Sequence, residues 1–285
     1  MVNARQLLSE AKGELELAGE RFGRVGDEED QAWELLEHAL GREPGEWEEI
    51  GSAAARRFHR LLKRRLTGEP VELIVGWVEF CGLRMSVKPG VFIPRLTSEF
   101  LASQAIRRLR RRRHPVYLDV AAGIGPVAIA AARAVPHASV WALDISRRAL
   151  AQGRANAARL HVDNVTFLAS DLFAAVPDSL LGKVDVISGH LPYVARADLA
   201  GLPEEIKAFE PRDTLSDGSR DGLGLVRRVV REGYFWLKPG GWLLIEIMPS
   251  ESRRVRTLLG SSGFTGIRST HGSLKQTRVI VGHKP

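Results

Sequence analysis

Apolar residues recur every three or four positions over about residues 4–66, the spacing that places side chains on one face of an α-helix. Glycine and proline interrupt the pattern at 41–45. The apolar positions are Leu7, Leu8, Ala11, Leu15, Leu17, Trp33, Leu35, Leu36, Ala39 and Leu40. The stretch carries no set of residues suited to catalysis. We therefore predict a packed helical domain over 1–70, with a role in covering or recognition and not in catalysis.

The pattern changes at Val71, where apolar residues follow one another with few interruptions. Two runs, 71–80 and 83–87, flank the pair Cys81-Gly82, and two short strands around a tight turn are typical of a hairpin. We therefore expect a β-hairpin linker over 71–92. Beyond Pro94 an amphipathic helix is expected to run to the arginine-rich stretch at 107–113.

After Pro115 short apolar runs alternate with helical patterns, which predicts a parallel α/β sheet covered by helices on both faces. The expected strands are 116–120, 139–144, 165–168, 183–188 and 241–246, and the expected helices are 127–135, 146–160 and 223–236. The last two strands, 266–270 and 278–281, have no crossover between them, so an antiparallel edge is expected. The fold class is α/β, with the sheet domain over 93–285.

Composition narrows the function classes. No run of about 18 apolar residues exists, and the N-terminus lacks the layout of a signal peptide, so we expect a cytoplasmic protein with no membrane span. Cys81 has no second cysteine for a disulfide or a zinc site.

The net charge of +7 is compatible with binding to a nucleic acid. However, the basic residues are scattered apart from 107–113, which ends a helix, where cations are favourable. An acidic protein is therefore kept as an alternative binding partner.

A glycine-rich turn follows the first strand of the sheet domain, where ligands bind in open α/β sheets. The segment 119–126 reads Asp-Val-Ala-Ala-Gly-Ile-Gly-Pro, and glycines let the backbone approach a ligand closely. Its Gly123 and Gly125 also fit a dinucleotide-binding pattern. The turn alone does not identify the ligand.

Three carboxylates at successive strand ends favour S-adenosylmethionine (SAM) over a dinucleotide. The Asp119 carboxylate would repel a pyrophosphate, because both are negatively charged. The ammonium group of SAM is positively charged and would pair favourably with it. Asp144 is placed to accept hydrogen bonds from ribose hydroxyls, and Asp171 could accept from the adenine amino group. We therefore expect SAM, or its product S-adenosylhomocysteine, in the main pocket.

At this point the chain resembles the HemK/PrmC family, class I SAM-dependent methyltransferases that modify a glutamine side chain in peptide release factors. The resemblance implies a helical substrate-recognition domain, a hairpin linker and a Rossmann-like seven-stranded SAM domain. It covers nearly the whole chain and is carried by the segments 67–70, 92–95 with Glu99, 119–125, 144–150 with Asn156, 170–173, 192–193, 210–212, 221–223 and 241–247. Together with the strand-end pattern it assigns cofactor binding to Asp119, Ala121, Gly123, Gly125, Asp144, Ile145, Ser170, Asp171, Leu172 and His190.

The chain departs from the family where the chemistry is expected. The family signature is Asn-Pro-Pro-Tyr, and here the segment reads His190-Leu191-Pro192-Tyr193. In the family the Asn oxygen and a backbone carbonyl are thought to hold the two amide hydrogens of glutamine; a neutral histidine accepts through one ring nitrogen only. We predict catalytic roles for His190, Pro192 and Tyr193. The predicted substrate contacts are Arg95, Glu99, Leu191, Tyr193 and Arg212.

Three functions follow from this departure. In the first, the methyl group goes to a nitrogen or oxygen acceptor other than release-factor glutamine, with His190 as general base. In the second, the SAM pocket serves an elimination or ring closure on an amino-acid-like substrate, which an acidic carrier protein could present. In the third, the chain is a non-catalytic SAM-binding partner of another protein, such as a homologous subunit.

Overall fold

The computed structural model describes residues 2–22 and 27–285, which divide into two compact units. The first, here called the helical unit, contains the chain up to Trp77 together with 87–89 and 200–210. The second, here called the sheet unit, contains 78–86, 90–199 and 211–285. Each unit is described by itself below.

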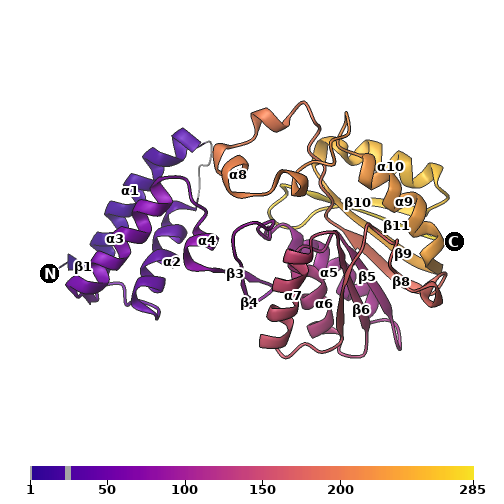
Figure 1. Cartoon of the computed structure of the whole chain (residues 1–285), viewed down its shortest axis with the longest axis horizontal. Helices are drawn as coiled ribbons and strands as arrows, with labels where there is room; N and C mark the ends of the chain where they lie inside the picture. Colours follow the sequence, from indigo (N-terminus) through magenta and orange to yellow (C-terminus); the bar gives the residue numbers. More distant parts are fainter. Residues whose placement is uncertain (1, 23–26) are drawn as a thin grey trace. The chain divides into compact units, whose positions relative to one another are not determined.

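The helical unit confirms the pattern read from the sequence. Its helices are α1 (Ala4–Phe22), α2 (Glu28–Leu40), α3 (Ser52–Leu66), α4 (Val71–Val75) and α8 (Glu204–Phe209), and a two-residue antiparallel pair joins β1 (Val2–Asn3) to β2 (Glu49–Ile50) (Figure 1). Leu7, Leu35, Leu36, Phe58 and Leu62 share one buried cluster. The helical spacing therefore brings the expected apolar faces together.

The prediction of an extended segment over 71–75 was wrong, because these residues form the short helix α4. Val71, Leu73, Ile74 and Val75 are all buried, and Gly76, with φ of 82°, ends the helix in the left-handed conformation. A continuous apolar run is compatible with a buried strand or a buried helix, and periodicity does not separate the two. The hairpin is therefore shorter than predicted: it pairs β3 (Trp77–Phe80) with β4 (Leu83–Ser86).

The sheet unit contains the predicted seven-stranded sheet, in the order β10-β11-β9-β8-β5-β6-β7. Strands β5 to β9 run parallel, and β11 pairs antiparallel with both β9 and β10, which confirms the antiparallel edge. The strands are β5 (Val116–Val120), β6 (Ser139–Asp144), β7 (Val165–Ala169), β8 (Val184–Gly189), β9 (Leu237–Ile247), β10 (Thr265–Thr270) and β11 (Arg278–His283).

Helices cover both faces of this sheet (Figure 1). One core cluster joins the sheet to α5 (Ser98–Leu109), α6 (Pro126–Ala134) and α7 (Arg147–Arg159), and the other joins it to α9 (Gly224–Trp236) and α10 (Ser252–Ser261). Short 3-10 turns lie at Asp178–Leu180, Leu199–Gly201, Arg212–Thr214 and Pro249–Glu251. Helix α10 was not anticipated from the sequence, because only its Val255 and Leu259 are buried among polar neighbours.

The arginine-rich run at the end of α5 is partly used inside the fold. The Arg108 guanidinium lies 4.4 Å from the centre of the Trp242 ring, and burial lowers the pKa of Arg108 to about 10. Arg112 donates to the Gly240 carbonyl and lies 3.6 Å from Asp185.

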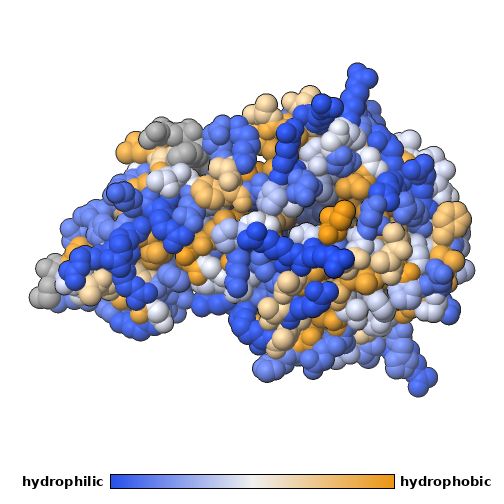
Figure 2. Space-filling view, viewed as in Figure 1, coloured by the Kyte–Doolittle hydropathy of each residue, from blue (hydrophilic) through white to orange (hydrophobic). Residues whose placement is uncertain are grey.

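Hydrophilic residues cover much of the visible surface, with apolar residues between them (Figure 2). Among the described residues, no helix is long and apolar enough to span a membrane.

A buried ion pair holds the segment 200–210 within the helical unit. Arg65 of α3 donates to the Glu205 carboxylate of α8 at 3.0 Å and to the Gln31 side chain at 2.7 Å. The Arg65 and Glu205 side chains are only 7% and 6% exposed. Residues more than a hundred positions apart in the chain are thus joined by charge inside one core.

Arg65→Ala is expected to lower the free energy of unfolding by about 3 kcal/mol or more, because it removes the cation that pairs with the buried Glu205 carboxylate. Urea unfolding followed by circular dichroism measures the loss. Arg64→Ala is the matched control: Arg64 pairs with Glu69 with 46% of its side chain exposed, and should cost about 1 kcal/mol or less. Equal losses of unfolding free energy in the two variants would contradict the larger contribution expected of the buried pair.

Candidate active site

The glycine-rich turn after β5 adopts the conformations that its residues suggest. Gly123 and Gly125 have φ values of 58° and 77°. A Cβ on Gly125 would lie 2.6 Å from the Phe167 ring, so a side chain there would clash. Ala121 is also left-handed, with φ of 55°, which costs a residue with a Cβ about 1 kcal/mol. The turn therefore keeps a glycine-like backbone where alanine replaces the glycine of the family resemblance.

Asp144 at the end of β6 is tied to this turn. Its carboxylate accepts hydrogen bonds from the Gly123 amide at 2.7 Å and from the Ser146 amide at 2.8 Å. Burial raises the pKa of Asp144, and these backbone donors oppose the rise. Ile145 beside it is 73% exposed. The carboxylate keeps lone pairs that could accept from a ribose, with an apolar side chain next to it.

Asp119 at the end of β5 lies deeper, at 3% exposure. The Ser188 hydroxyl donates to its carboxylate at 2.5 Å, and the Tyr117 hydroxyl contacts Ser188 at 2.5 Å. Burial raises the pKa of Asp119 to about 7; the hydroxyls of Ser188 and Tyr117 and the Ala128 amide oppose the rise, and the charge of Asp144 adds to it. Near neutral pH this carboxyl group therefore changes its charge readily.

The third carboxylate is placed differently. Asp171, after β7, is half exposed and forms an ion pair with Arg228 of α9 at 3.0 Å. Its neighbour Ser170 accepts from the Ala175 amide, and Leu172 is buried with φ of 50°. The structure thus ties Asp144 to the glycine turn, places Asp119 at the base of that turn, and pairs Asp171 with a cation.

His190 forms the centre of a second group of side chains, directly after β8. Its Nδ1 lies 3.0 Å from the Ser98 hydroxyl and 3.7 Å from Oε2 of Glu246. Its ring stacks on Tyr193, with centroids 5.5 Å apart, and meets the ring of Phe92 edge-on at 5.6 Å. Two aromatic rings and two polar side chains therefore hold the imidazole in place.

Tyr193 is suited to contact and not to proton removal. Burial and the nearby Glu246 charge raise the pKa of Tyr193 to about 12, which keeps its hydroxyl protonated near neutral pH. Leu191 is buried, and Pro192 between them is half-buried. Of the side chains in 190–193, only that of His190 carries a nitrogen with a lone pair that can accept a proton.

The structure does not bring all the predicted substrate residues together. Arg95 stacks its guanidinium 4.7 Å from the centre of the Phe92 ring and so belongs to the His190 surroundings. Glu99 accepts a hydrogen bond from the Cys81 amide at 2.5 Å, which fastens the turn of the β3–β4 hairpin. Arg212 is exposed at the start of a 3-10 turn.

Ser98 and Glu246 were not singled out from the sequence as site residues. The available signal was Glu246 itself, a charged residue inside the apolar run 242–247. A carboxylate in a strand that is otherwise buried requires a partner, but the sequence does not say which residue supplies it.

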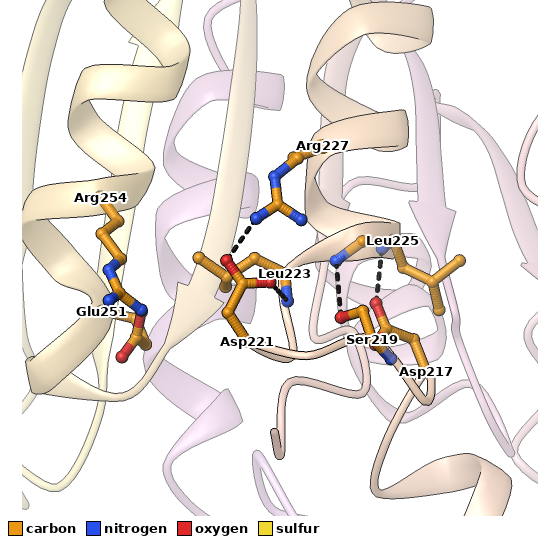
Figure 3. A network of polar contacts seen from close by, with 9 residues as sticks. Asp217, Ser219, Asp221, Leu223, Leu225, Arg227, Glu251 and Arg254 are labelled. Carbon is orange, nitrogen blue, oxygen red and sulfur yellow. Dashed lines mark hydrogen bonds and ion pairs between the residues drawn. The ribbon is translucent and has the colours of Figure 1, made fainter. Parts of the chain in front are cut away.

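A polar network joins the loop before α9 to the first turns of that helix (Figure 3). Asp217 accepts from the Leu225 amide at 2.8 Å, Ser219 accepts from the Gly224 amide at 3.3 Å, and Asp221 pairs with Arg227. Between these residues lies Gly222, where an added Cβ would come within 2.1 Å of the Tyr193 carbonyl oxygen. The loop that carries this network therefore packs a glycine directly against the backbone of Tyr193.

Among the described residues, no cluster of three or more histidine, cysteine or acidic side chains is arranged to hold a metal ion. The glycine turn and the Asp144 carboxylate fit a nucleoside with vicinal hydroxyls, and Asp119 fits a cationic group once it is ionised. These residues are consistent with SAM.

If Asp119 receives the ammonium group of the nucleoside, the affinity for S-adenosylhomocysteine should fall as the pH drops below about 7. The carboxyl is protonated below its pKa and must release that proton before it can pair with the cation, so Kd should rise up to about tenfold per pH unit. Calorimetry between pH 5.5 and 8 measures this dependence.

Asp119→Asn is the control for this dependence, since it keeps the shape but does not ionise. It should bind more weakly above pH 7 and lose most of the pH dependence; Asp144 would account for the remainder, because burial also raises its pKa. A wild-type Kd that stays constant from pH 5.5 to 8 would contradict a contact between Asp119 and the cation.

Comparisons with known proteins agree with this geometry. Residues 112–247 match a methyltransferase domain family, and residues 6–76 match the PrmC N-terminal domain family. A release factor glutamine methyltransferase from Burkholderia pseudomallei is 36% identical over 88% of this chain and 90% of its own length. One from Deinococcus radiodurans is 34% identical over 91% of both chains.

Solved structures with low sequence identity share the fold. The 16S rRNA N2 G1207 methyltransferase of Thermus thermophilus matches 73% of this chain and 50% of its own, with a TM-score of 0.53 and 17% identity. A methyltransferase from Pyrococcus furiosus matches 71% of this chain and 89% of its own, with a TM-score of 0.52 and 15% identity. By its fold and its relatives, the chain belongs to the HemK/PrmC family of SAM-dependent methyltransferases.

Proposed function

We propose that this protein transfers the methyl group of SAM to a nitrogen or oxygen nucleophile other than the release-factor glutamine, on a protein or amino-acid-like substrate. The observation that carries the proposal is the environment of His190. Its ring is held between Phe92 and Tyr193, with Nδ1 directed to Ser98 and Glu246. A histidine fixed through one nitrogen is suited to accept a proton through the other.

The proposed reaction is a methyl transfer in which His190 is the base. When bound, SAM supplies an electrophilic methyl carbon, whose bond to sulfur breaks as the thioether forms. The lone pair of the acceptor makes the new bond to carbon, and the acceptor proton passes to Nε2 of His190. Asp119 and Asp144 would hold the nucleoside, with Ile145 beside its base. Positioning the acceptor and removing its proton are what the protein contributes.

Glutamine in a release factor is the second candidate, and a specific observation favours it. The relatives named above carry that activity in their names, and residues 6–76 match the PrmC N-terminal domain. Against it stands the single acceptor atom that His190 offers to an amide with two hydrogens. An amide nitrogen is also a weak nucleophile, so it depends more on exact orientation than a hydroxyl or an amine does.

We further propose that the segment before residue 71 recognises the substrate, since the match to the PrmC N-terminal domain spans 6–76. In this proposal 71–92 remains the linker and 93–285 the methyl-transfer domain. An acidic carrier protein or a homologous subunit would be a partner for the basic chain, whose net charge is +7.

The test is incubation of the purified protein with SAM and panels of acceptors: a bacterial release factor, free amino acids, and carrier-bound amino acids. Mass spectrometry follows S-adenosylhomocysteine and a mass gain of one methyl group. We expect turnover with a hydroxyl or amine acceptor, and a loss of at least about a hundredfold in His190→Ala, the usual scale for a general base.

Phe92→Leu is the matched control, because it removes a ring that touches His190 and keeps the imidazole. Its loss should be much smaller than that of His190→Ala. Methylation of the release factor alone would overturn the proposal in favour of the second candidate. Product formation from a bound amino acid without S-adenosylhomocysteine would indicate a non-methylating reaction instead.

A further inference from the structure

Glu246 is a carboxylate in the centre of the sheet. It lies in β9 between Ile245 and Ile247, and its side chain is 0% exposed. Its Oε1 accepts a hydrogen bond from the Thr277 hydroxyl at 2.9 Å. Its Oε2 is buried and has no hydrogen-bond partner among the residues that the structure describes. A buried carboxylate oxygen without a donor is unfavourable, so its position requires an explanation.

The imidazole of His190 lies close to this oxygen. Oε2 lies 3.7 Å from Nδ1, slightly beyond hydrogen-bond distance. Contacts of this kind are often long without substrate and shorten when the site is filled. The Ser98 hydroxyl lies 3.0 Å from the same nitrogen and can accept from it or donate to it.

The charge of the Glu246 carboxylate distinguishes the two possible hydrogen bonds between Ser98 and Nδ1. If the Ser98 hydroxyl donated to Nδ1, the lone pair of that nitrogen would face a buried negative oxygen, which is repulsive. If Nδ1 carries the hydrogen, its positive end lies between the Ser98 oxygen and the Glu246 carboxylate. The second arrangement leaves the lone pair on Nε2, the nitrogen that would accept a proton.

We propose that Glu246 is a positioning residue for His190: its buried carboxylate holds the imidazole in the tautomer with hydrogen on Nδ1, which makes Nε2 the base. This inference rests on the proposed function, because it concerns the same histidine. After Nε2 takes the acceptor proton, the positive charge of the imidazolium lies beside the Glu246 carboxylate, which stabilises it. Thr277 fixes the other oxygen and so orients the carboxylate.

The tautomer can be measured without any acceptor. The full chain is labelled with nitrogen-15 in histidine, and two-dimensional spectra are recorded at pH 8 with S-adenosylhomocysteine bound; comparison with His190→Asn assigns the His190 signals among the eight histidines. In the wild type, Nδ1 should show the shift of a protonated ring nitrogen and Nε2 that of an unprotonated one. The opposite pattern in the wild type would by itself overturn the proposal.

Glu246→Gln replaces the carboxylate by an amide of the same shape, which can donate to Nδ1. The two His190 signals should then move toward the pattern with hydrogen on Nε2. Ser98→Ala is the matched control: it removes the other neighbour of Nδ1 and keeps the carboxylate, so the wild-type pattern should persist. A Glu246→Gln spectrum identical to that of the wild type would contradict the role of Glu246.

Kinetics separate this role from general support of the fold. With an acceptor that is turned over, Glu246→Gln should lower kcat at least tenfold and leave the KM for SAM and the Kd for S-adenosylhomocysteine within twofold. A rise in both constants with unchanged kcat would indicate a structural role and overturn the proposal. If methyl transfer itself is not found, the proposed function fails, whereas the spectra still decide the tautomer.

Discussion

The pairing of β5 with β8 is the constraint on which the site depends. These strands are parallel neighbours in register, with Asp119 opposite Ser188 and Val120 opposite Gly189. The glycine turn and the His190 segment therefore begin at adjacent points of one sheet edge, although Ala121 and His190 lie 69 positions apart in the chain. Gly189 permits this approach, since a Cβ there would lie 3.3 Å from the Val120 carbonyl oxygen. A donor group on the turn and an acceptor near His190 would thus meet across two strand ends.

Two carboxylates buried in the same sheet have different surroundings and would therefore do different work. Asp119 has donors on its carboxylate and a pKa raised to about 7, so it suits a cation that arrives and leaves. Glu246 has Thr277 on one oxygen and an imidazole near the other. Removing such groups from water is costly, and in both cases the compensating partner is a group with a proposed part in the reaction. The sheet core is thus linked directly to the chemistry at its edge.

The segment after β8 connects both units through the chain. It begins with His190 in the sheet unit, passes through 200–210 in the helical unit, and returns before Arg212. The Arg65–Glu205 pair anchors its middle, and the network around Asp217 and Asp221 supports Tyr193 at its start. Of the residues proposed to contact the acceptor, Leu191, Tyr193 and Arg212 therefore lie on this segment, close to its two ends.

The chain pattern by itself determined the order of the α/β elements, the antiparallel edge and the glycine turn with Asp144, because these depend on local periodicity and on residues close in sequence. It also singled out His190, since the departure from the family signature lies within four consecutive residues. Periodicity could not assign 71–75, where a fully apolar run suits helix or strand equally. The tertiary structure alone brought Ser98 and Glu246 to His190, Arg228 to Asp171 and Glu205 to Arg65. These partners lie between 56 and 140 positions apart, and only the packed sheet and helices decide which side chains meet.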